Sequence, residues 1–430
     1  MMNLNGPIRT DLPDEFDMNN EQHECRFCNK VLDYTFVDLG MSPLANSYIK
    51  KGDLQRMEPF YPLHAYVCDS CYLVQLPTLQ DPEDIFSDYA YFSSYSDSWL
   101  NHVKEYTDLV IERFGFDTDT QVIEIASNDG YLLQYFKEQG IPVLGIEPAE
   151  NVAKAAREKG ISTIVEFHCE KSAKELAGRG IYADLLIGNN VLAHVPELND
   201  FVRGMKIILR SNGIITMEFP HVMRLMEENQ FDTIYHEHFS YFSFISVVNI
   251  FSEHGLRIFD VEELPTHGGS LRIYACHGED SSKGLTSKVG ELIAREEKAG
   301  FKELKHYLSF EERVKAIKLG ILSFFVEAKR QGKSIVGYGA PAKGNTLLNY
   351  CGIRTDFIAY TVDRSPHKQG HFLPGTRIPI YHPDKVHESR PDYLVILPWN
   401  LKDEIMEQMS YIRNWGAQFI TLIPEVRITS

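Results

Sequence analysis

Four cysteines near the start of the chain form two pairs, each separated by two residues: Cys25 with Cys28, and Cys68 with Cys71. A C-x2-C turn can place two thiolates on one side of a loop, and two such turns complete the tetrahedral sulfur cage that Zn²⁺ prefers. Unligated surface cysteines or a redox pair are the alternatives. Because four sulfur ligands leave no open coordination position, we expect the zinc to be structural rather than catalytic.

A second set of polar residues follows two predicted strands. QVIEIA, which contains Glu124, runs into SNDG, and PVLGIE ends at Glu147. Ligands of open parallel sheets gather at such carboxyl ends, and an acid after the second strand can accept hydrogen bonds from both ribose hydroxyls. The acidic turn at Asp129 would repel a pyrophosphate, so the pattern favours S-adenosylmethionine (AdoMet) over a dinucleotide; solvated strand-end carboxylates are the alternative. The residues expected to contact AdoMet are Glu124, Ala126, Asn128, Asp129, Gly130, Glu147, Pro148, Asn189 and Asn190.

Acid–base candidates follow the fourth and fifth predicted strands. ADLLIGNNVLAHVP carries His194, for which a packed or capping histidine is the alternative, and DTIYHEHFSYFS places His236, Glu237 and His238 in succession beside Tyr235. Burying such groups without partners is costly. A metal site is disfavoured because adjacent side chains of an extended strand point to opposite faces. A solvated loop is the other alternative, and we interpret the segment as an acid–base cluster.

A glycine-rich turn marks the C-terminal part of the chain. The strand SIV leads into GYGAPAKG, with Lys343 at the start of a predicted helix. Glycines that free the backbone, followed by a lysine at a helix start, are typical of an anion site. A degenerate Rossmann-like scaffold without a bound nucleotide is the alternative. Apart from Asp363, which ends the next strand, no acid lies where a dinucleotide-binding domain would need one.

These residues are carried by alternating strands and helices. From about Thr120 to GIITMEF the alternation predicts a doubly wound parallel sheet with helices on both faces, and a shorter α/β pattern ends the chain after a Lys/Glu-rich helical region, about Ser282 to Gly332. The predicted fold class is therefore α/β, with a zinc-binding module and two Rossmann-like domains. The predicted units are a flexible arm (1–22), a zinc-binding module (23–85), a methyltransferase domain with its leading loop and helix (86–280), and a helical bridge with a C-terminal α/β domain (281–430).

Composition and charge limit the function classes. The 430 residues are 43% hydrophobic and 24% charged, as in globular domains, and the net charge is −17. No run of Lys or Arg offsets this charge, so we do not expect a nucleic acid partner. No stretch reaches the roughly 18 apolar residues that span a bilayer, and the start lacks a secretion signal. We therefore expect a cytoplasmic protein without a membrane partner, whose reduced cysteines can bind metal.

Taken in order along the chain, these motifs resemble a known family. The two cysteine pairs, EIASNDG, GIEP, NVLAHVP, YHEHxxYFS, HGGSLR and GYGAPAKG resemble the nucleotide-sugar C-methyltransferases that make branched deoxysugars, best known for C-3 methylation of dTDP-4-keto sugars. The likeness covers nearly the whole chain from Cys25 onward. One departure is Ala126, where the family pattern is expected to have glycine; a single methyl group there should be tolerated, with some effect on cofactor affinity.

The resemblance implies C-methylation of a nucleotide-linked 4-keto-deoxysugar, the nucleotide being dTDP, GDP or CDP. A ketone at C-4 acidifies the C-3 hydrogen, a base removes it, and the enolate carbon attacks the AdoMet methyl group. His238 is the expected base, with Glu237 as rival or partner, because a histidine already titrates near neutrality. The other implied catalytic residues are Tyr235, His194, Tyr89 and Tyr91. The residues expected to hold the sugar nucleotide are Asn190, His267, Arg272, Lys343, His367 and Lys368.

Other functions fit parts of the pattern. An O- or N-methyltransferase would use the same cluster to deprotonate a hydroxyl or an amine. A zinc-ribbon interaction protein without catalysis is opposed by the retention of Glu147 and YHEH, and an RNA methyltransferase is opposed by the negative charge. The sequence leaves the oligomeric state open.

Overall fold

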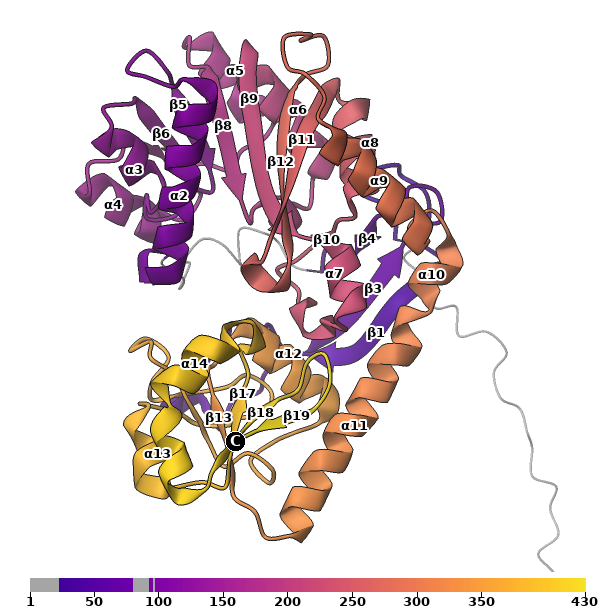
Figure 1. Ribbon diagram of the computed structural model, residues 1–430, viewed down its shortest axis with the longest axis vertical. Coiled ribbons are helices and arrows are strands. Elements are labelled where there is room, and N and C mark those ends of the chain that lie inside the picture. The colour runs from indigo at the N-terminus through magenta and orange to yellow at the C-terminus, as the bar shows by residue number, and fades with distance from the viewer. Residues whose placement is uncertain (1–22, 80–92, 96) are drawn as a thin grey trace, which may run out of the picture.

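The computed structural model describes residues 23–79, 93–95 and 97–430. Two α/β domains lie one above the other in Figure 1, and a small sheet lies between them at one side. The predicted arm, residues 1–22, lies outside the described residues, as do Tyr89 and Tyr91.

The N-terminal module is an antiparallel sheet to which a later segment adds a strand. Its own paired strands are β1 (Tyr34–Ser42), β3 (Tyr61–Val67) and β4 (Val74–Gln75). The added strand β10 (Ser240–Tyr241) pairs with β4. In addition, β2 (Ile49–Lys50) pairs with β15 (His371–Phe372), which lies near the other end of the chain. The module therefore makes strand pairings with both larger domains.

The central domain holds a seven-stranded sheet in the order β11-β12-β9-β8-β5-β6-β7. The five strands from β9 to β7 run parallel, whereas β12 is antiparallel to both β9 and β11. The strands are β5 (Val122–Ile125), β6 (Val143–Ile146), β7 (Thr163–Ile164), β8 (Ala183–Asn189), β9 (Leu209–Pro220), β11 (Leu256–Leu264) and β12 (Ser270–His277). The helices are α2 (Asp97–Phe114), α3 (Leu133–Glu138), α4 (Glu150–Glu158), α5 (Glu170–Gly178), α6 (Leu198–Ile208), α7 (Val222–Glu227) and α8 (Phe244–Glu253).

The two faces of this sheet are both buried, as the sequence predicts. In β5, Ile123 and Ile125 belong to one core cluster and Val122 to another, so neighbouring side chains pack on opposite faces. Near-continuous apolar strands are expected when helices cover both faces of a parallel sheet. The strands predicted to be parallel, β5 to β9, are parallel, and a hairpin of β11 and β12 that was not predicted from the sequence extends the sheet. The connection of five residues, 265–269, is too short for a parallel crossover.

Three helices along one side of the molecule connect the central and C-terminal domains (Figure 1): α9 (Ser287–Ala299), α10 (Leu304–Leu308) and α11 (Phe310–Arg330). Glu296 of α9 is fully buried. Its carboxylate accepts hydrogen bonds from the N–H groups of Phe244 and Ile245 at the start of α8, and from the His221 ring. The predicted helical region is therefore present, and a buried carboxylate fixes it to the central domain.

The C-terminal domain contains a six-stranded sheet in the order β16-β14-β13-β17-β18-β19, parallel except for the last pair. Its strands are β13 (Ile335–Tyr338), β14 (Thr361–Val362), β16 (Ile380–Tyr381), β17 (Tyr393–Ile396), β18 (Gln418–Thr421) and β19 (Arg427–Thr429). Its helices are α12 (Ala342–Cys351), α13 (Asp384–Ser389) and α14 (Lys402–Gln408). The glycine-rich turn lies between β13 and α12, so the expected second Rossmann-like domain is confirmed.

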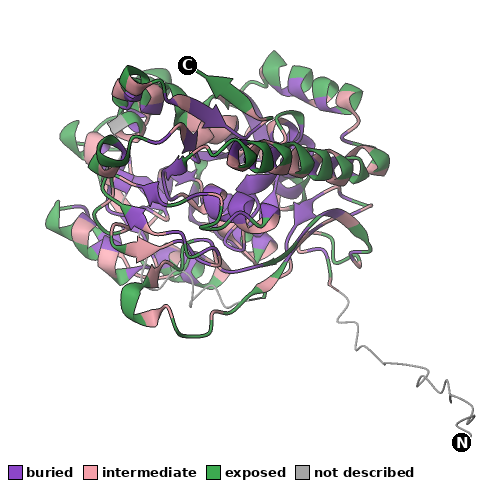
Figure 2. Ribbon diagram, turned by 90° about the horizontal axis from the view of Figure 1, so that it is seen from below, coloured by how far each residue is buried: buried purple, intermediate pink, exposed green. Residues whose placement is uncertain are grey.

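One hydrophobic core cluster crosses the boundaries between these units. It contains Phe36 of the N-terminal module, Tyr241 of β10, Phe310 of α11 and Ile335 of β13. Figure 2 shows the buried residues in the interior and the exposed residues on the outer faces of the helices. The unit limits given in the sequence analysis stay predictions, and β10 is a segment that joins the sheet of a unit outside its own.

Candidate active site and zinc centre

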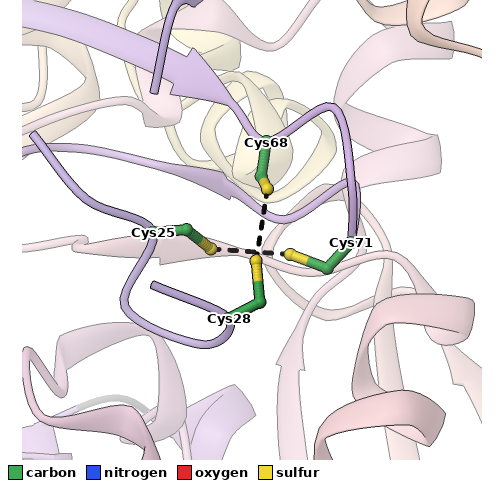
Figure 3. Close-up of side chains that lie close together, drawn as sticks. All are labelled: Cys25, Cys28, Cys68 and Cys71. Atoms are coloured by element: carbon green, nitrogen blue, oxygen red, sulfur yellow. Dashed lines mark hydrogen bonds between the residues drawn. The ribbon is translucent and has the colours of Figure 1, made fainter. Parts of the chain in front are cut away.

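The four predicted zinc ligands come together in the N-terminal module (Figure 3). Their sulfur atoms all lie within 4.8 Å of one another, and the Cys25–Cys71 and Cys28–Cys68 pairs are each 3.5 Å apart. Zn–S bonds of about 2.3 Å in a tetrahedron place sulfurs about 3.8 Å apart, so the arrangement fits a zinc ion. Hydrogen bonds from Cys68 and Cys71 lower the pKa of Cys25, whereas burial raises the pKa of Cys28 and the Cys25 contact raises that of Cys71, so the thiols interact as one group.

The zinc-binding module also supports the Tyr-His-Glu-His segment. Asn46 Nδ2 donates a hydrogen bond of 2.7 Å to Glu237 Oε1, and His236 Nε2 lies 3.2 Å from the carbonyl oxygen of Pro62. The strand that follows this segment, β10, pairs with β4 of the module. The zinc ligands therefore stabilise a sheet on which the candidate catalytic segment rests, although the ion itself has no open position for a substrate.

The turn after β5 adopts an uncommon backbone conformation. Ala126, Asn128 and Gly130 have φ values of 56°, 48° and 73°. Glycine takes this left-handed region without strain, which explains why glycine is the expected residue where this chain has Ala126. A Cβ atom on Gly130 would lie 2.9 Å from Ile161 Cγ1, so packing against Ile161 also requires this glycine.

Glu124, in β5, is fully buried, and the Tyr131 hydroxyl is the hydrogen-bonding group that acts on its carboxyl group within the described residues. Burial raises its pKa well above the usual range, and the Tyr131 hydroxyl acts in the opposite direction. Asn189 interacts with the Tyr131 hydroxyl, whereas Ser127 Oγ and Asp129 Oδ1 are buried and without partners within the described part of the chain. Buried polar groups normally have partners, so these atoms fit a bound polar cation such as AdoMet.

Glu147 follows β6 and is 5% exposed. Its Oε2 accepts a hydrogen bond from the N–H of Asn128 and its Oε1 from the N–H of Ala149, both at 2.9 Å. Burial raises its pKa, whereas these two hydrogen bonds lower it. Each oxygen keeps a further acceptor position, which the predicted ribose contact needs. Pro148, the next residue, is half-buried.

The end of β8 contacts the connection between β11 and β12. Asn190 Nδ2 donates to His267 Nε2 at 3.1 Å, and both residues have positive φ values of 54° and 55°. Burial lowers the pKa of His267 to about 4, so its ring is neutral and can accept this bond. Asn190 Oδ1 is buried without a partner among the described residues. Two predicted substrate-binding residues thus contact each other at the carboxyl end of β8, beside the predicted AdoMet site.

His194 and His238 lie close together near the same edge. Their ring centroids are 4.7 Å apart, and the Tyr235 ring lies 4.0 Å from that of His238. The Nδ1–H of His194 donates to the carbonyl oxygen of Glu237, and the Nδ1–H of His238 donates to that of Thr233. His238 Nε2 is therefore the ring nitrogen that can accept a proton. All three residues are partly and not fully buried.

The Tyr-His-Glu-His segment forms a turn before β10, not the extended strand considered from the sequence. His236 and Glu237 point toward the N-terminal module, and His238 points toward His194. Burial raises the pKa of Glu237 to about 6, whereas burial and then His194 lower the pKa of His238 well below its usual value. From the sequence, a histidine base is expected because a free histidine titrates near neutrality. In the structure, burial moves the pKa of His238 away from neutrality and the pKa of Glu237 toward it.

Lys343 brings a cation from the C-terminal domain to this cluster. It lies in the first turn of α12, and its Nζ is 3.3 Å from both the carbonyl oxygen of His267 and Oδ1 of Asn400. Nζ also lies 4.6 Å from the centre of the Trp399 ring, whose Nε1 donates to Asp232 at 2.7 Å. Burial lowers the pKa of Lys343 to about 8, and the charge of Asp232 acts in the opposite direction.

The glycine-rich turn after β13 is bonded to side chains around it. The N–H of Ala340 donates to Asp363 at 2.8 Å, and its carbonyl oxygen accepts hydrogen bonds from Lys368 Nζ and from the Tyr48 hydroxyl. His367 is exposed. The structure therefore brings Lys368 onto the predicted anion-binding turn, whereas His367 lies at the surface.

Arg272, in β12, takes part in a buried ion pair. Its Nη2 lies 3.0 Å from Glu218 Oε2, and its guanidinium group lies over the Tyr106 ring. Glu218 is also 2.9 Å from His102 Nε2 of α2. With an exposed fraction of 4%, Arg272 connects β12 to β9, and its contact with a diphosphate stays a prediction.

Sequence reasoning missed residues that complete this cluster. Asn46, Asp232 and Trp399 were not singled out, and Trp99 lies 5.4 Å from His267 between ring centroids. These contacts join segments as far apart as 191 residues, so motif spacing cannot reveal them. One available signal was rarity, because two of the three tryptophans in the chain lie here.

The strand order of the central sheet, with acidic and amide side chains at the carboxyl ends of its parallel strands, defines an AdoMet-dependent α/β methyltransferase. Family models match three consecutive parts of the chain: a zinc-binding domain at 25–86, a methyltransferase domain at 99–261, and a C-methyltransferase C-terminal domain at 265–424. The C-methyltransferase NovU of Streptomyces niveus is 35% identical over 407 residues, which are 95% of this chain and 97% of NovU. The chain therefore belongs to the C-methyltransferase family represented by these domains.

Solved structures align with part of this chain at low similarity. Magnesium protoporphyrin IX methyltransferase ChlM of Synechocystis PCC 6803 is 14% identical, with a TM-score of 0.32, covering 41% of this chain and 79% of ChlM. The PH0226 protein of Pyrococcus horikoshii OT3 is 16% identical, with a TM-score of 0.35, covering 46% of this chain and 99% of that protein. Among the described residues, no helix has the length and apolar character needed to cross a membrane.

Proposed function

We propose that this C-methyltransferase acts on a nucleotide-linked 4-keto-deoxysugar and places the methyl group on C-3. The observation that carries the proposal is the cluster of His194, Tyr235 and His238 beside the cofactor edge of the central sheet, with Lys343 of the C-terminal domain nearby. A carbon next to a ketone becomes nucleophilic only when a base removes its proton, and this cluster offers neutral imidazoles for that purpose. AdoMet, when bound, supplies an electrophilic methyl group.

The base that we propose is His238. Its Nδ1–H is held by the carbonyl oxygen of Thr233, which leaves Nε2 as the proton acceptor and fixes the orientation of the ring. Glu237 is the rival, because its raised pKa of about 6 is close to the working range, but its carboxylate is hydrogen-bonded to Asn46 on the side of the zinc-binding module. The position of His238 beside His194 is what favours it as the base.

The nucleotide diphosphate, of dTDP, GDP or CDP, is assigned to the C-terminal domain. Lys368 on the turn at Ala340 supports this assignment, since a lysine beside the backbone at a helix start suits a phosphate. The contacts predicted for Asn190, His267, Arg272 and His367 belong to the same proposal.

The proposal is tested by mass spectrometry of a panel of nucleotide 4-keto-sugars incubated with the enzyme and AdoMet. We expect a mass gain of one methyl group for at least one substrate, and a methyl group that hot hydriodic acid does not release because it is bound to carbon. A methyl group released as methyl iodide by this reagent would show O- or N-methylation instead. No gain with any 4-keto-sugar would overturn the proposed substrate class.

A further inference from the structure

Lys343 is a cation whose close contacts, among the described residues, are with neutral groups: two oxygens and the Trp399 ring. It lies in the first turn of α12, where the helix dipole disfavours positive charge. Its two hydrogen bonds are long, at 3.3 Å, and go to neutral oxygens of His267 and Asn400. The carboxylate whose charge acts on Lys343 is that of Asp232. This carboxylate accepts a hydrogen bond from Trp399 Nε1, and none from Lys343 is found. A partly buried ammonium that has no carboxylate within ion-pair distance in the described part of the chain is costly, and an anion that arrives with the ligand can compensate it.

The surroundings of Lys343 connect it with the reacting end of the substrate rather than with the nucleotide. Lys343 contacts His267, and the ring of His267 is hydrogen-bonded to Asn190 at the end of β8. The charge of Lys343 also acts on His238, the proposed base. Like these residues, Lys343 is partly and not fully buried.

We infer that the Lys343 ammonium stabilises the oxyanion that forms at C-4 of the sugar when the C-3 proton is removed. This inference rests on the proposed function. The base takes the C-3 proton, the C–H electron pair becomes the C-3 to C-4 double bond, and the carbonyl electron pair moves onto the C-4 oxygen. Lys343 stays protonated and transfers no proton. When C-3 forms its bond to the methyl group, the bond between that methyl group and the AdoMet sulfur would break and leave its electron pair on sulfur as S-adenosylhomocysteine, while the carbonyl re-forms at C-4 and the negative charge disappears.

Enzymes commonly stabilise an oxyanion with a positively charged or hydrogen-bonding group that is already in position before the reaction. A donor aimed at developing negative charge in an enclosed site is worth much more than in water, and removing one costs on the order of 100-fold to 1,000-fold in kcat. The sequence-based alternative, a diphosphate contact, would instead be felt in ground-state binding and raise KM. The two roles therefore predict different kinetics for the same variant.

The test compares the full-length zinc-loaded enzyme with Lys343→Met, a neutral side chain of similar length. We expect kcat for methyl transfer and the exchange of the C-3 hydrogen with solvent deuterium to fall about 100-fold. KM for the nucleotide sugar and the dissociation constant for AdoMet should change by less than about threefold. Thermal unfolding checks that the variant folds, which we expect because Asp232 keeps its bond to Trp399.

A second variant, Lys343→Arg, keeps a positive charge at this position. Because arginine does not lose its proton in the alkaline range, the variant tests whether deprotonation of Lys343 limits the wild type. The titratable groups that interact with Lys343 are Asp232 of η4 (Phe231–Thr233), His267 of η5 (Thr266–Gly268) and His238, and His194 of η3 (Leu192–His194) interacts with both histidines. Since the pKa of Lys343 is about 8, kcat of the wild type should fall above pH 8 as the ammonium loses its proton. Lys343→Arg should retain more activity than Lys343→Met and lack this alkaline decline.

The outcomes separate the inference from the function on which it rests. If the wild-type enzyme neither exchanges the C-3 hydrogen of any 4-keto-sugar with solvent nor methylates it, the proposed function is wrong. An active wild type whose Lys343→Met variant keeps kcat and exchange, with KM raised, overturns the inference and assigns Lys343 to the diphosphate. Equal loss in the Met and Arg variants, with normal folding and with the alkaline decline kept in the Arg variant, also overturns it.

Discussion

Glu237 and His238 are neighbours in the sequence, yet their surroundings shift their pKa values in opposite directions. Burial favours the neutral form of both groups, which raises the pKa of the carboxylic acid to about 6 and lowers that of the imidazole. At neutral pH the glutamate is then mostly ionised, while the histidine is neutral with a weakly basic Nε2. Either can accept a proton, so position and not pKa alone decides which one is the base.

The base is identified by two variants and a pH profile. His238→Asn should reduce methyl transfer and C-3 hydrogen exchange by about 100-fold or more while AdoMet affinity stays nearly unchanged, and Glu237→Gln is the matched control. In kcat/KM, a glutamate base would give a decline as the pH falls through about 6, where the carboxylate becomes protonated. With His238 as the base, whose pKa is well below 6.5, no such decline is expected. Loss of turnover in the glutamine variant alone would make Glu237 the base.

Cofactor binding should depend on the acid after β6. Glu147→Ala removes the acceptor for the ribose hydroxyls and should weaken AdoMet by about 2 kcal/mol, the scale of hydrogen bonds to a charged group. Calorimetric titration measures this loss. The control is Glu150→Ala, an exposed carboxylate at the start of α4, which should leave the affinity unchanged. An unchanged affinity in the Glu147 variant would show that the ribose lies elsewhere.

At the scale of elements, the strand β10 explains why a structural zinc site belongs in this enzyme. The strand is two residues long and pairs with β4, which begins three residues after Cys71. So short a strand has little stability of its own and depends on the sheet that it joins. The zinc ligands thus stabilise the platform that holds the turn before β10, and with it the orientation of the candidate base.

Removal of a zinc ligand should therefore affect stability first. Cys25→Ser opens a four-sulfur site, and such sites contribute about 10 kcal/mol or more to the folding of a small module, so we expect insoluble or strongly destabilised protein. Elemental analysis and thermal unfolding measure the effect. Cys169→Ser is the control, because Cys169 caps α5 and serine is a preferred cap residue. Wild-type protein purified without stoichiometric metal would contradict the zinc assignment.

Local sequence patterns predict the individual helices and strands better than they predict which of these elements contact each other. The cysteine spacing identified the zinc ligands, and the apolar runs identified β5, β6 and β8, because both signals are local. The hairpin of β11 and β12 was not foreseen, since the sequence of β11 was not recognised as a strand. The turn at Glu237 was considered as a strand because its support from Asn46 comes from 191 residues away.

At the scale of the whole molecule, the three units share a core and the site lies where they meet. Phe36 stacks on Phe310 of the bridge at 4.7 Å, and Tyr72 stacks on Tyr307 at 5.9 Å. The candidate site draws Asn46 from the first unit and Lys343 from the third. The order of the units could be predicted from the sequence, but their contacts could not, because each contact pairs residues whose spacing carries no signal. Proper packing of the bridge is therefore a condition for an assembled site.

Glu296 is the residue on which that packing most visibly depends. Its two carboxylate oxygens accept hydrogen bonds from the N–H groups of Phe244 and Ile245 and from the His221 ring, at 2.6 to 2.8 Å. Glu296→Gln would turn an N–H₂ group toward one of these donors, leaving buried donors unpaired, so unfolding should become easier by about 3 kcal/mol. Denaturant unfolding followed by fluorescence measures this change as a lower midpoint with an unchanged slope. Glu291→Gln, exposed on the same helix, should leave the midpoint unchanged. Folded Glu296→Gln should keep its AdoMet affinity, and wild-type stability in this variant would show that α9 is held by its apolar contacts alone.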